Sequence, residues 1–304
     1  MNNLRKELEK LDLKINGIKY QGKTRIIETN KGKLVYKESN NYDTYEYLKT
    51  RDFNFFPRSL NDKNANYELR EYINTKDIPE EQKLNDLIHI SGVLHRKTSF
   101  NKEVDMDNIK EIYENIISEV DYLTNYYNDL NEYIDSVVFM SPSEYLLVSN
   151  IDIIYYLLSF VRVEIDNWYS FIKDKKVIRY SMIHNNLSLN HLLEGDNKYL
   201  ISWSNAKLDM PIHDLIRLYE DNFYDMNLED LIREYEYENK LDYYEYLFFL
   251  IKLAIPKRIE FTKNTYLDCN KISKYLIYLQ KIAVLVQKNE KNKQKVWLFS
   301  TLVV

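Results

Sequence analysis

Three short segments in the middle of the chain gather histidine, amide, hydroxyl and acidic side chains: residues 184–191, 202–203 and 209–214. The three histidines among them, His184, His191 and His213, carry nitrogen atoms of the kind that bind zinc. Their positions in loops, without a fixed helical spacing, make a poor zinc signature. We therefore expect the cluster to serve another chemistry.

The order of residues in these segments resembles the aminoglycoside phosphotransferase and choline-kinase-like family. In that family a His-x-Asp-x-x-x-x-Asn loop precedes an Ile-Asp-Trp/Phe strand end and an Asp-x-Pro-x-x-Asp-Leu helix entry. Here the loop begins at His184, the strand end is Ile201-Ser202-Trp203 and the helix entry spans residues 209–215. The resemblance covers nearly the whole chain and implies an ATP-using, two-lobed kinase-like fold. Residues 94–98, Leu-His-Arg-Lys-Thr, are most similar to the spore-coat kinase-like branch of endospore-forming bacteria.

The resemblance also implies a nucleotide site before residue 74. Lys37 ends a strand, Leu34 to Glu38, that is similar to the family strand whose lysine pairs with nucleotide phosphates. Glu46, on the next helix, is then placed to hold this lysine. Glu71 and Tyr72 belong to the hinge whose backbone would meet an adenine.

Three positions depart from the family pattern at the residues that carry its chemistry. The catalytic acid, which accepts or orients the substrate hydroxyl proton, is replaced by Asn186. The metal-binding Asn is replaced by His191, although Asn190 is adjacent. The magnesium-chelating Asp is replaced by Ser202, a neutral hydroxyl where a hard cation prefers carboxylate oxygen.

The positions that shape the loop are kept, in contrast. They are His184, Leu187, Trp203, Pro211 and Asp214. By the resemblance, Asp214 ties down the catalytic loop from the start of a helix, and His184 is a hydrogen-bonded loop anchor. A chain that keeps this scaffold and lacks the acids is predicted to be a pseudokinase. It would act as a binding or structural module for a small molecule or a protein partner, with no cofactor required, in the cytoplasm or in the spore coat.

Two other functions stay open. One is an ATP- and magnesium-dependent phosphotransferase of a small hydroxylated substrate, with an altered metal site shared by Asn190, His191 and Asp209. The other is a toxin-neutralising or regulatory partner that uses the fold as a surface.

The elements before residue 74 are predicted to form a small antiparallel β lobe with one helix. An opening helix, Leu4 to Leu11, precedes β-rich runs over residues 14–20, 24–29, 33–38 and 67–73, and the polar turn at residues 30–33 marks a hairpin. A short helix over residues 43–50 places Tyr45 and Leu48 on one side.

From Pro79 the apolar period changes from two to about 3.6, which predicts helices. They span residues 80–94, 104–134, 151–172, 214–224, 228–238, 243–253 and 270–287, and the third is apolar on most sides, which indicates central burial. Short β runs over 177–203 interrupt them. The fold class is therefore α+β, with a β-rich unit at residues 1–74 and a helical lobe at residues 75–304. The apolar tail, residues 296–304, is either a docked strand or an unnatural terminus.

Composition excludes several classes of protein. The 304 residues are 45% hydrophobic and 29% charged, close to an average globular chain, and the net charge of −5 gives no overall attraction to nucleic acid or an anionic membrane. Charges at the N-terminus argue against a signal peptide, and the longest apolar stretches are too short to span a bilayer. The one cysteine, Cys269, excludes an intramolecular disulfide and is expected to be inert.

Overall fold

The computed structural model describes residues 8, 12–22, 24–38, 41–60, 65–262 and 264–301, with only the backbone for 291–301. The chain forms two compact units: unit 1 is Met1–Phe100 with Tyr180–Lys240, and unit 2 is Asn101–Arg179 with Leu241–Val304. These units differ from the predicted segments 1–74 and 75–304, because the helix after the hinge packs with the central loop and its helices inside unit 1. The predicted opening helix lies, except for Leu8, outside the described residues.

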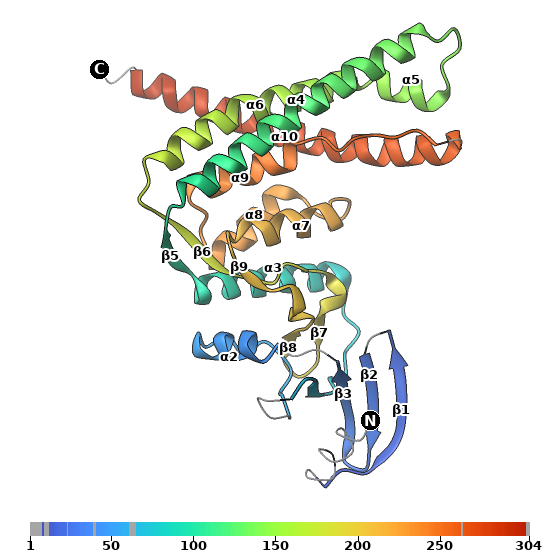
Figure 1. The fold of residues 1–304 in the computed structure, drawn as a ribbon, viewed down its shortest axis with the longest axis vertical. Helices are drawn as coiled ribbons and strands as arrows, with labels where there is room; N and C mark the ends of the chain where they lie inside the picture. Colours follow the sequence, from blue (N-terminus) through green and yellow to red (C-terminus); the bar gives the residue numbers. More distant parts are fainter. Residues whose placement is uncertain are drawn as a thin grey trace. The chain divides into compact units, whose positions relative to one another are not determined.

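The first part of unit 1 is a four-stranded antiparallel sheet in sequential order (Figure 1). Its strands are β1 (Ile15–Gln21), β2 (Thr24–Thr29), β3 (Gly32–Lys37) and β4 (Glu68–Glu71). Thr29 pairs with Gly32 across the predicted hairpin turn, and Gly32 has φ 131°, a conformation that side chains rarely adopt. The small antiparallel sheet predicted from the sequence is therefore confirmed.

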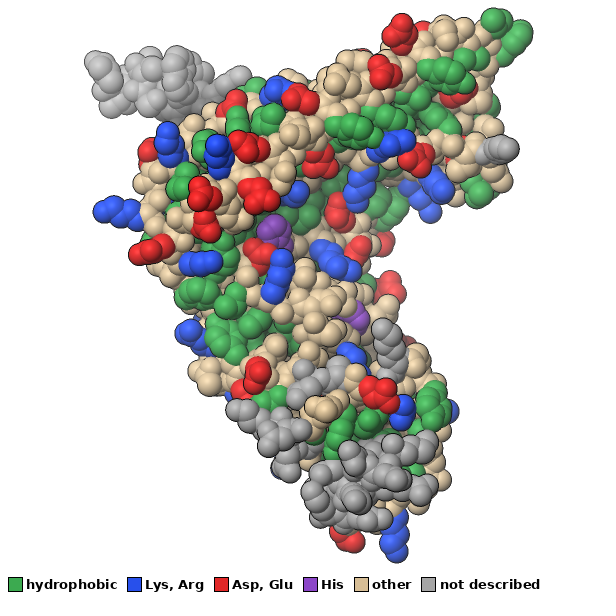
Figure 2. Space-filling model, in the orientation of Figure 1, with side chains coloured by type: hydrophobic (Ala, Val, Ile, Leu, Met, Phe, Trp, Pro, Cys, Tyr) green, Lys and Arg blue, Asp and Glu red, His purple; other side chains and the backbone are tan. Residues whose placement is uncertain are grey.

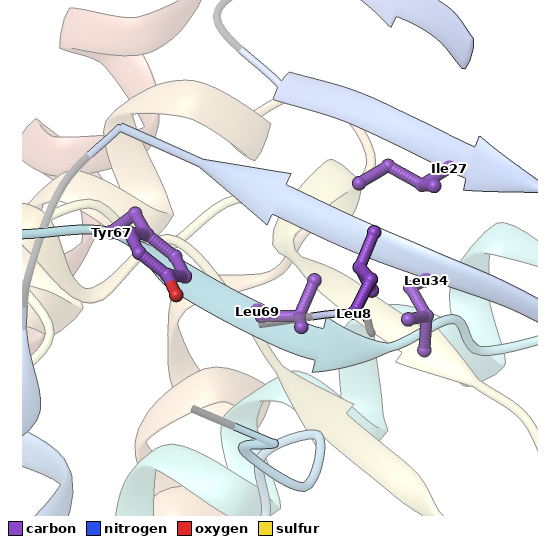
Figure 3. Packing of buried hydrophobic residues seen from close by; sticks show 5 residues of the cluster. All are labelled: Leu8, Ile27, Leu34, Tyr67 and Leu69. Carbon is purple, nitrogen blue, oxygen red and sulfur yellow. The ribbon is translucent and has the colours of Figure 1, made fainter. Parts of the chain in front are cut away.

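Alternation along the strands divides the sheet into two faces. One face packs a core of Leu8, Ile27, Leu34, Tyr67 and Leu69, shown from close by in Figure 3. The register pairs Thr24 with Lys37 and Lys37 with Glu68, and it pairs Val35 with Arg70. Since cross-strand partners share a face, these polar side chains lie on the side away from the core.

The remaining elements of unit 1 surround the central loop. They are α2 (Tyr42–Thr50), α3 (Glu80–Thr98), the 3₁₀ turns η1 (Leu189–His191) and η2 (Trp203–Asn205), β7 (Leu192–Glu194), β8 (Lys198–Leu200), β9 (Lys207–Asp209), α7 (Ile212–Asn222) and α8 (Leu228–Glu238). Tyr45 and Leu48 of α2 are buried, as their spacing predicts. Helix α3 packs against α8 and η1, and Ser181–Ile183 pair with β9. The chain passes between the units in β5 (Phe100–Glu103) and β6 (Val177–Ile183).

Unit 2 is helical. It contains α4 (Met106–Ser136), α5 (Pro142–Val148), α6 (Ile151–Lys173), α9 (Tyr243–Ala254) and α10 (Thr265–Thr301). The predicted central helix is confirmed, since α6 packs against α4, α9 and α10. Helix α5 was not predicted from the sequence; its N-cap is Ser141, which forms a reciprocal capping box with Glu144. Helix α10 runs to Thr301, so a docked strand is wrong for the tail up to that residue.

The described surface of unit 2 carries mixed charge and has an exposed apolar segment between α4 and α5. Lysine and arginine side chains alternate with acidic ones on the described part of the face in Figure 2. Val138 and Phe139, between α4 and α5, are 86% and 88% exposed, and hydrophobic side chains gather at that end of the helices in Figure 2. Among the described residues no single helix is long and apolar enough to cross a membrane. Helices α5 and α6 reach the required length and hydropathy only when taken together, and a bend of 43° separates them.

The contact of α3 with α8 leads to a first prediction. A Cβ added at Gly92 would lie 2.8 Å from Cβ of Glu238 and 3.4 Å from the carbonyl oxygen of Tyr235. Alanine gains about 1 kcal/mol over glycine inside a helix, but overpacking costs about 1–3 kcal/mol. We expect Gly92→Ala to lower the free energy of unfolding, measured by urea denaturation. The control Ser91→Ala removes only a hydroxyl bonded within α3 and should change stability less; equal or higher stability for Gly92→Ala would contradict the close contact.

Candidate functional site

A buried carboxylate holds the central loop, residues 184–191. Asp214, in the first turn of α7, is fully buried and accepts hydrogen bonds from the main-chain N–H groups of His184 (2.7 Å) and Asn185 (2.7 Å). Asn185 has φ 55°, a left-handed conformation that asparagine tolerates better than most residues. Two consecutive N–H groups therefore converge on one carboxylate, and this fixes the path of the chain into the loop.

Asp214 also ends a chain of buried polar groups from α3 and α8. Its Oδ2 lies 3.1 Å from Nε2 of His95, and Nδ1 of His95 lies 2.8 Å from the hydroxyl of Tyr235. Asn239 donates to that hydroxyl (2.6 Å), so the tyrosine proton points to His95 and the imidazole donates from Nε2. Burial raises the pKa of Asp214, but the hydrogen bond from His95, together with the contributions of His184 and its main-chain N–H, holds that pKa below its ordinary value. The carboxylate is therefore ionised at neutral pH.

His184 connects the loop to the segment before Ser202. Its Nε2 donates to the carbonyl oxygen of Ile201 (2.8 Å), and its ring packs edge-on against Trp203 at 4.8 Å between centroids. Burial lowers the pKa of His184, against the opposing effect of the Asp214 carboxylate. A neutral, enclosed imidazole of this kind holds two strands of chain together rather than exchanging protons with a ligand.

The positions of the absent family acids present only neutral groups. Asn186 is partly buried, and its main-chain oxygen accepts a hydrogen bond from Nδ1 of His191 (2.7 Å), which fixes that ring within the loop. Ser202 has φ 71° and ψ 47°, a left-handed conformation in which aspartate is more common than serine. Asp209, the acid of the alternative metal site, pairs with Lys207 (2.6 Å) and caps its own strand end at Met210.

A cavity of about 450 Å³ lies between the polar face of the sheet and the segments that follow the central loop, all within unit 1. Its lining comes from β1–β4, α2 and the segment after it, the hinge, the end of the central loop and the residues that follow it: Gln21, Thr24, Ile26, Val35, Lys37, Tyr45, Pro57, Glu68, Arg70, Glu71, Tyr72, Ile73, Thr75, Asn190, Leu193, Ile201 and Ser202. The volume falls in the range of small-molecule sites. The predicted residues Lys37, Glu71, Tyr72 and Ser202 therefore share one cavity.

Main-chain hydrogen bonds join the two walls of this cavity. Leu200 donates to the carbonyl oxygen of Phe55 (2.7 Å), and Lys76, just after the hinge, donates to that of Glu194 (2.7 Å). At Gly195, in the turn from β7 to β8, an added Cβ would lie 2.8 Å from Cγ2 of Ile73. The backbone of the β7–β8 turn at Gly195 therefore packs directly against the side chain of Ile73 in the hinge.

The expected pairing of Lys37 with Glu46 is not made. Glu46 instead pairs with Lys49 at 2.7 Å, three residues further along α2, and both side chains are more than two-fifths exposed. In the described part of the chain Lys37 forms no ion pair. The reason is local. Glu46 lies on the partly exposed face of α2, where Lys49 is one turn away, whereas Tyr45 lies on the buried face.

A buried ion pair that was not predicted from the sequence lies beside Lys37. Nε of Arg70 donates to Oε2 of Glu68 (3.1 Å), and both side chains are 9% exposed. Nη1 of Arg70 donates to the carbonyl oxygen of Pro57 (2.6 Å), and the guanidinium carbon lies 3.5 Å from the ring centroid of Tyr45. The signal in the sequence was the alternation Glu68-Leu69-Arg70, which places both charges on one face.

The donor set does not fit the magnesium ion that the family fold implies. Magnesium prefers carboxylate and phosphate oxygens, whereas the residues at the corresponding positions are Asn186, His191 and Ser202. Within the described ranges, no group of three or more His, Cys, Asp or Glu side chains is placed to hold a metal. At the positions where the family resemblance places acids and the metal-binding amide, this site therefore offers an amide, an imidazole and a hydroxyl.

Comparison with solved structures confirms the kinase-like fold. An aminoglycoside phosphotransferase from Alicyclobacillus acidocaldarius is similar with a TM-score of 0.63 at 11% identity, over 91% of this chain and 93% of that one. A spectinomycin phosphotransferase bound to AMP gives 0.50 at 12% identity, over 91% and 97%. Choline kinase from Streptococcus pneumoniae gives 0.48 at 14% identity, over 95% and 98%. No family model and no curated protein matches the sequence.

The lowered pKa of His184 predicts a specific dependence of stability on pH. Because the folded protein keeps this imidazole neutral, below pH of about 6.5 the unfolded chain binds a proton that the folded protein does not. The free energy of unfolding should therefore be constant above neutral pH and fall as the pH drops through 6.5 toward 5. Urea denaturation across this range should show a shallower fall in His184→Gln, which keeps a donor for Ile201. Parallel profiles for the two proteins would contradict this assignment.

Proposed function

We propose that this chain, which has the fold of the aminoglycoside phosphotransferases, is a pseudokinase: a binding module that does not transfer phosphoryl groups. The observation that carries the proposal is the combination of a loop held in place by Asp214 with an amide, Asn186, where the family resemblance puts the acid. The scaffold for catalysis is present and the ionisable group is replaced.

Magnitudes support the loss of transfer. A general acid–base group contributes about 10²- to 10⁴-fold to rate, and metal-ion stabilisation of charge contributes several kcal/mol more. With Asn186 and Ser202 both neutral, the two contributions are removed from one site. His191 does not replace the metal ligand, because magnesium prefers oxygen to an imidazole nitrogen, and the hydrogen bond of Nδ1 to the main chain of Asn186 keeps the ring within the loop.

The retained features favour binding. The cavity has a polar face, an apolar part from Ile26 and Val35, and a hinge, which together suit a small molecule with one anionic or polar end. A place in spore-coat assembly, implied by the similarity at residues 94–98, stays a prediction. His95 of that segment has a structural duty in unit 1, since it contacts Asp214.

The competing function, an ATP-dependent phosphotransferase, is favoured by the solved structures that share the fold and by the position of Lys37 in the cavity. If it is correct, the unmodified protein transfers phosphate from ATP, and Lys37→Ala abolishes the transfer without unfolding the chain. The two functions are thus separated by the same assay.

The test measures ATP hydrolysis and transfer to a panel of hydroxylated acceptors with magnesium. We expect no turnover from the unmodified protein and weak, magnesium-dependent hydrolysis from the double variant Asn186→Asp with Ser202→Asp, because it restores an acceptor and a metal ligand. Matched controls are Asn185→Asp and Ser204→Asp, which add the same charges one and two residues away. Turnover by the unmodified protein would overturn the proposal.

A further inference from the structure

Lys37 is a cation left without a counterion in the cavity wall. Its strand neighbours on the same face are Thr24, a hydroxyl, and Glu68, a carboxylate. Within the described residues no carboxylate oxygen lies within ion-pair distance of its ammonium group, although Glu68 is its direct cross-strand partner. The side chain is partly buried and lines the cavity.

The neighbouring carboxylates are engaged elsewhere. Glu68 accepts from Nε of Arg70 (3.1 Å) and from the main-chain N–H (3.1 Å) and Nδ2 (2.7 Å) of Asn41. Glu71 accepts from the N–H of Arg58 (3.0 Å). Since Glu68 and Arg70 neutralise each other, the charge of Lys37 is unbalanced at this part of the cavity.

The opposite wall presents neutral hydrogen-bonding groups. Asn190 and Ser202 line the cavity there, an amide and a hydroxyl that can donate directly to an anion. A carboxylate at position 202 would repel a phosphate unless a cation lay between the two. With serine the repulsion is absent, and so is the group that would hold the cation.

We propose that this cavity binds a phosphate-bearing ligand, of the nucleoside diphosphate or triphosphate class, through Lys37 without a divalent cation. The inference rests on the proposed function, in that it names the ligand of the same cavity, and it departs from the magnesium-bridged binding that the fold family implies. Magnesium bound to the ligand lowers its negative charge, and the two positions that would hold the ion, His191 and Ser202, offer it no carboxylate. Magnesium therefore weakens binding rather than supporting it.

Isothermal titration calorimetry with ADP, with EDTA and again with magnesium, tests this directly. We expect binding with EDTA that is several-fold weaker with magnesium, and Lys37→Gln to weaken binding with EDTA about 10- to 100-fold, the range for a charged hydrogen bond. Lys37→Arg keeps the charge and should lose less. Adenosine and pyrophosphate, titrated alone, separate recognition of the nucleoside from recognition of the phosphates.

Ser202→Asp supplies the sharpest outcome, because it should reverse the sign of the magnesium effect. The added carboxylate weakens ADP binding with EDTA, and magnesium restores it. Aspartate suits the left-handed backbone at this position, so the variant is expected to fold, and circular dichroism checks this. Ser204→Asp, an exposed neighbour, should leave the unmodified behaviour unchanged.

Three results would overturn the inference: a requirement for magnesium in the unmodified protein, equal affinity of Lys37→Gln, or no binding of ADP or pyrophosphate under either condition. These outcomes are distinct from failure of the proposed function. Turnover of ATP with magnesium would refute the pseudokinase while metal-free binding of ADP still stood, and absence of binding would leave a pseudokinase without this ligand.

Discussion

The buried carboxylate of Asp214 is the interaction on which the geometry of unit 1 depends. It lies where α7 begins, and it collects hydrogen bonds from two consecutive main-chain N–H groups and from His95. A charge that is fully buried is costly unless every partner is in place, so removing any one of them would leave it uncompensated. The helices α3, α7 and α8 and the central loop are therefore held to one arrangement.

This anchoring explains how the loop keeps its shape while the residues of catalysis differ. The contacts that define its path use main-chain N–H groups, the ring of His184 and the carbonyl oxygen of Ile201. None of them involves the side chain of Asn186 or Ser202. The contacts that hold the loop are therefore independent of the side chains at positions 186 and 202. Either side chain can be replaced without removing one of these contacts.

The neutral residues at positions 186 and 202 also affect the balance of charge in the cavity. A magnesium-bridged site pairs carboxylates with phosphates through the metal, and it needs both acids to do so. Here amide and hydroxyl groups stand at those positions, Glu68 is paired with Arg70, and Lys37 forms no ion pair among the described residues. Neutral groups at both positions and an unpaired ammonium group at Lys37 are the features on which the proposed direct contact between an anion and the protein depends.

Most of the helices and strands, and the identity of the groups at positions 186 and 202, could be predicted from the sequence. Period-two runs around Gly32 predicted the hairpin, a 3.6-residue period predicted the long helices, and residue identity alone placed an amide at 186 and a hydroxyl at 202. These properties are local or belong to single residues, so no packing is needed to read them. The short helix α5 was not predicted, because it is marked in the sequence by a capping box and not by a repeated apolar spacing.

The pairing of side chains, in contrast, became known from the folded chain. Glu46 turned to Lys49, Arg70 paired with Glu68 in the cavity wall, and His95 reached Asp214 from a helix more than a hundred residues earlier. Likewise the compact units combine segments from both halves of the chain. Ion pairs and buried hydrogen bonds depend on strand register and on how helices pack, and such long-range geometry is fixed only when the whole chain has folded.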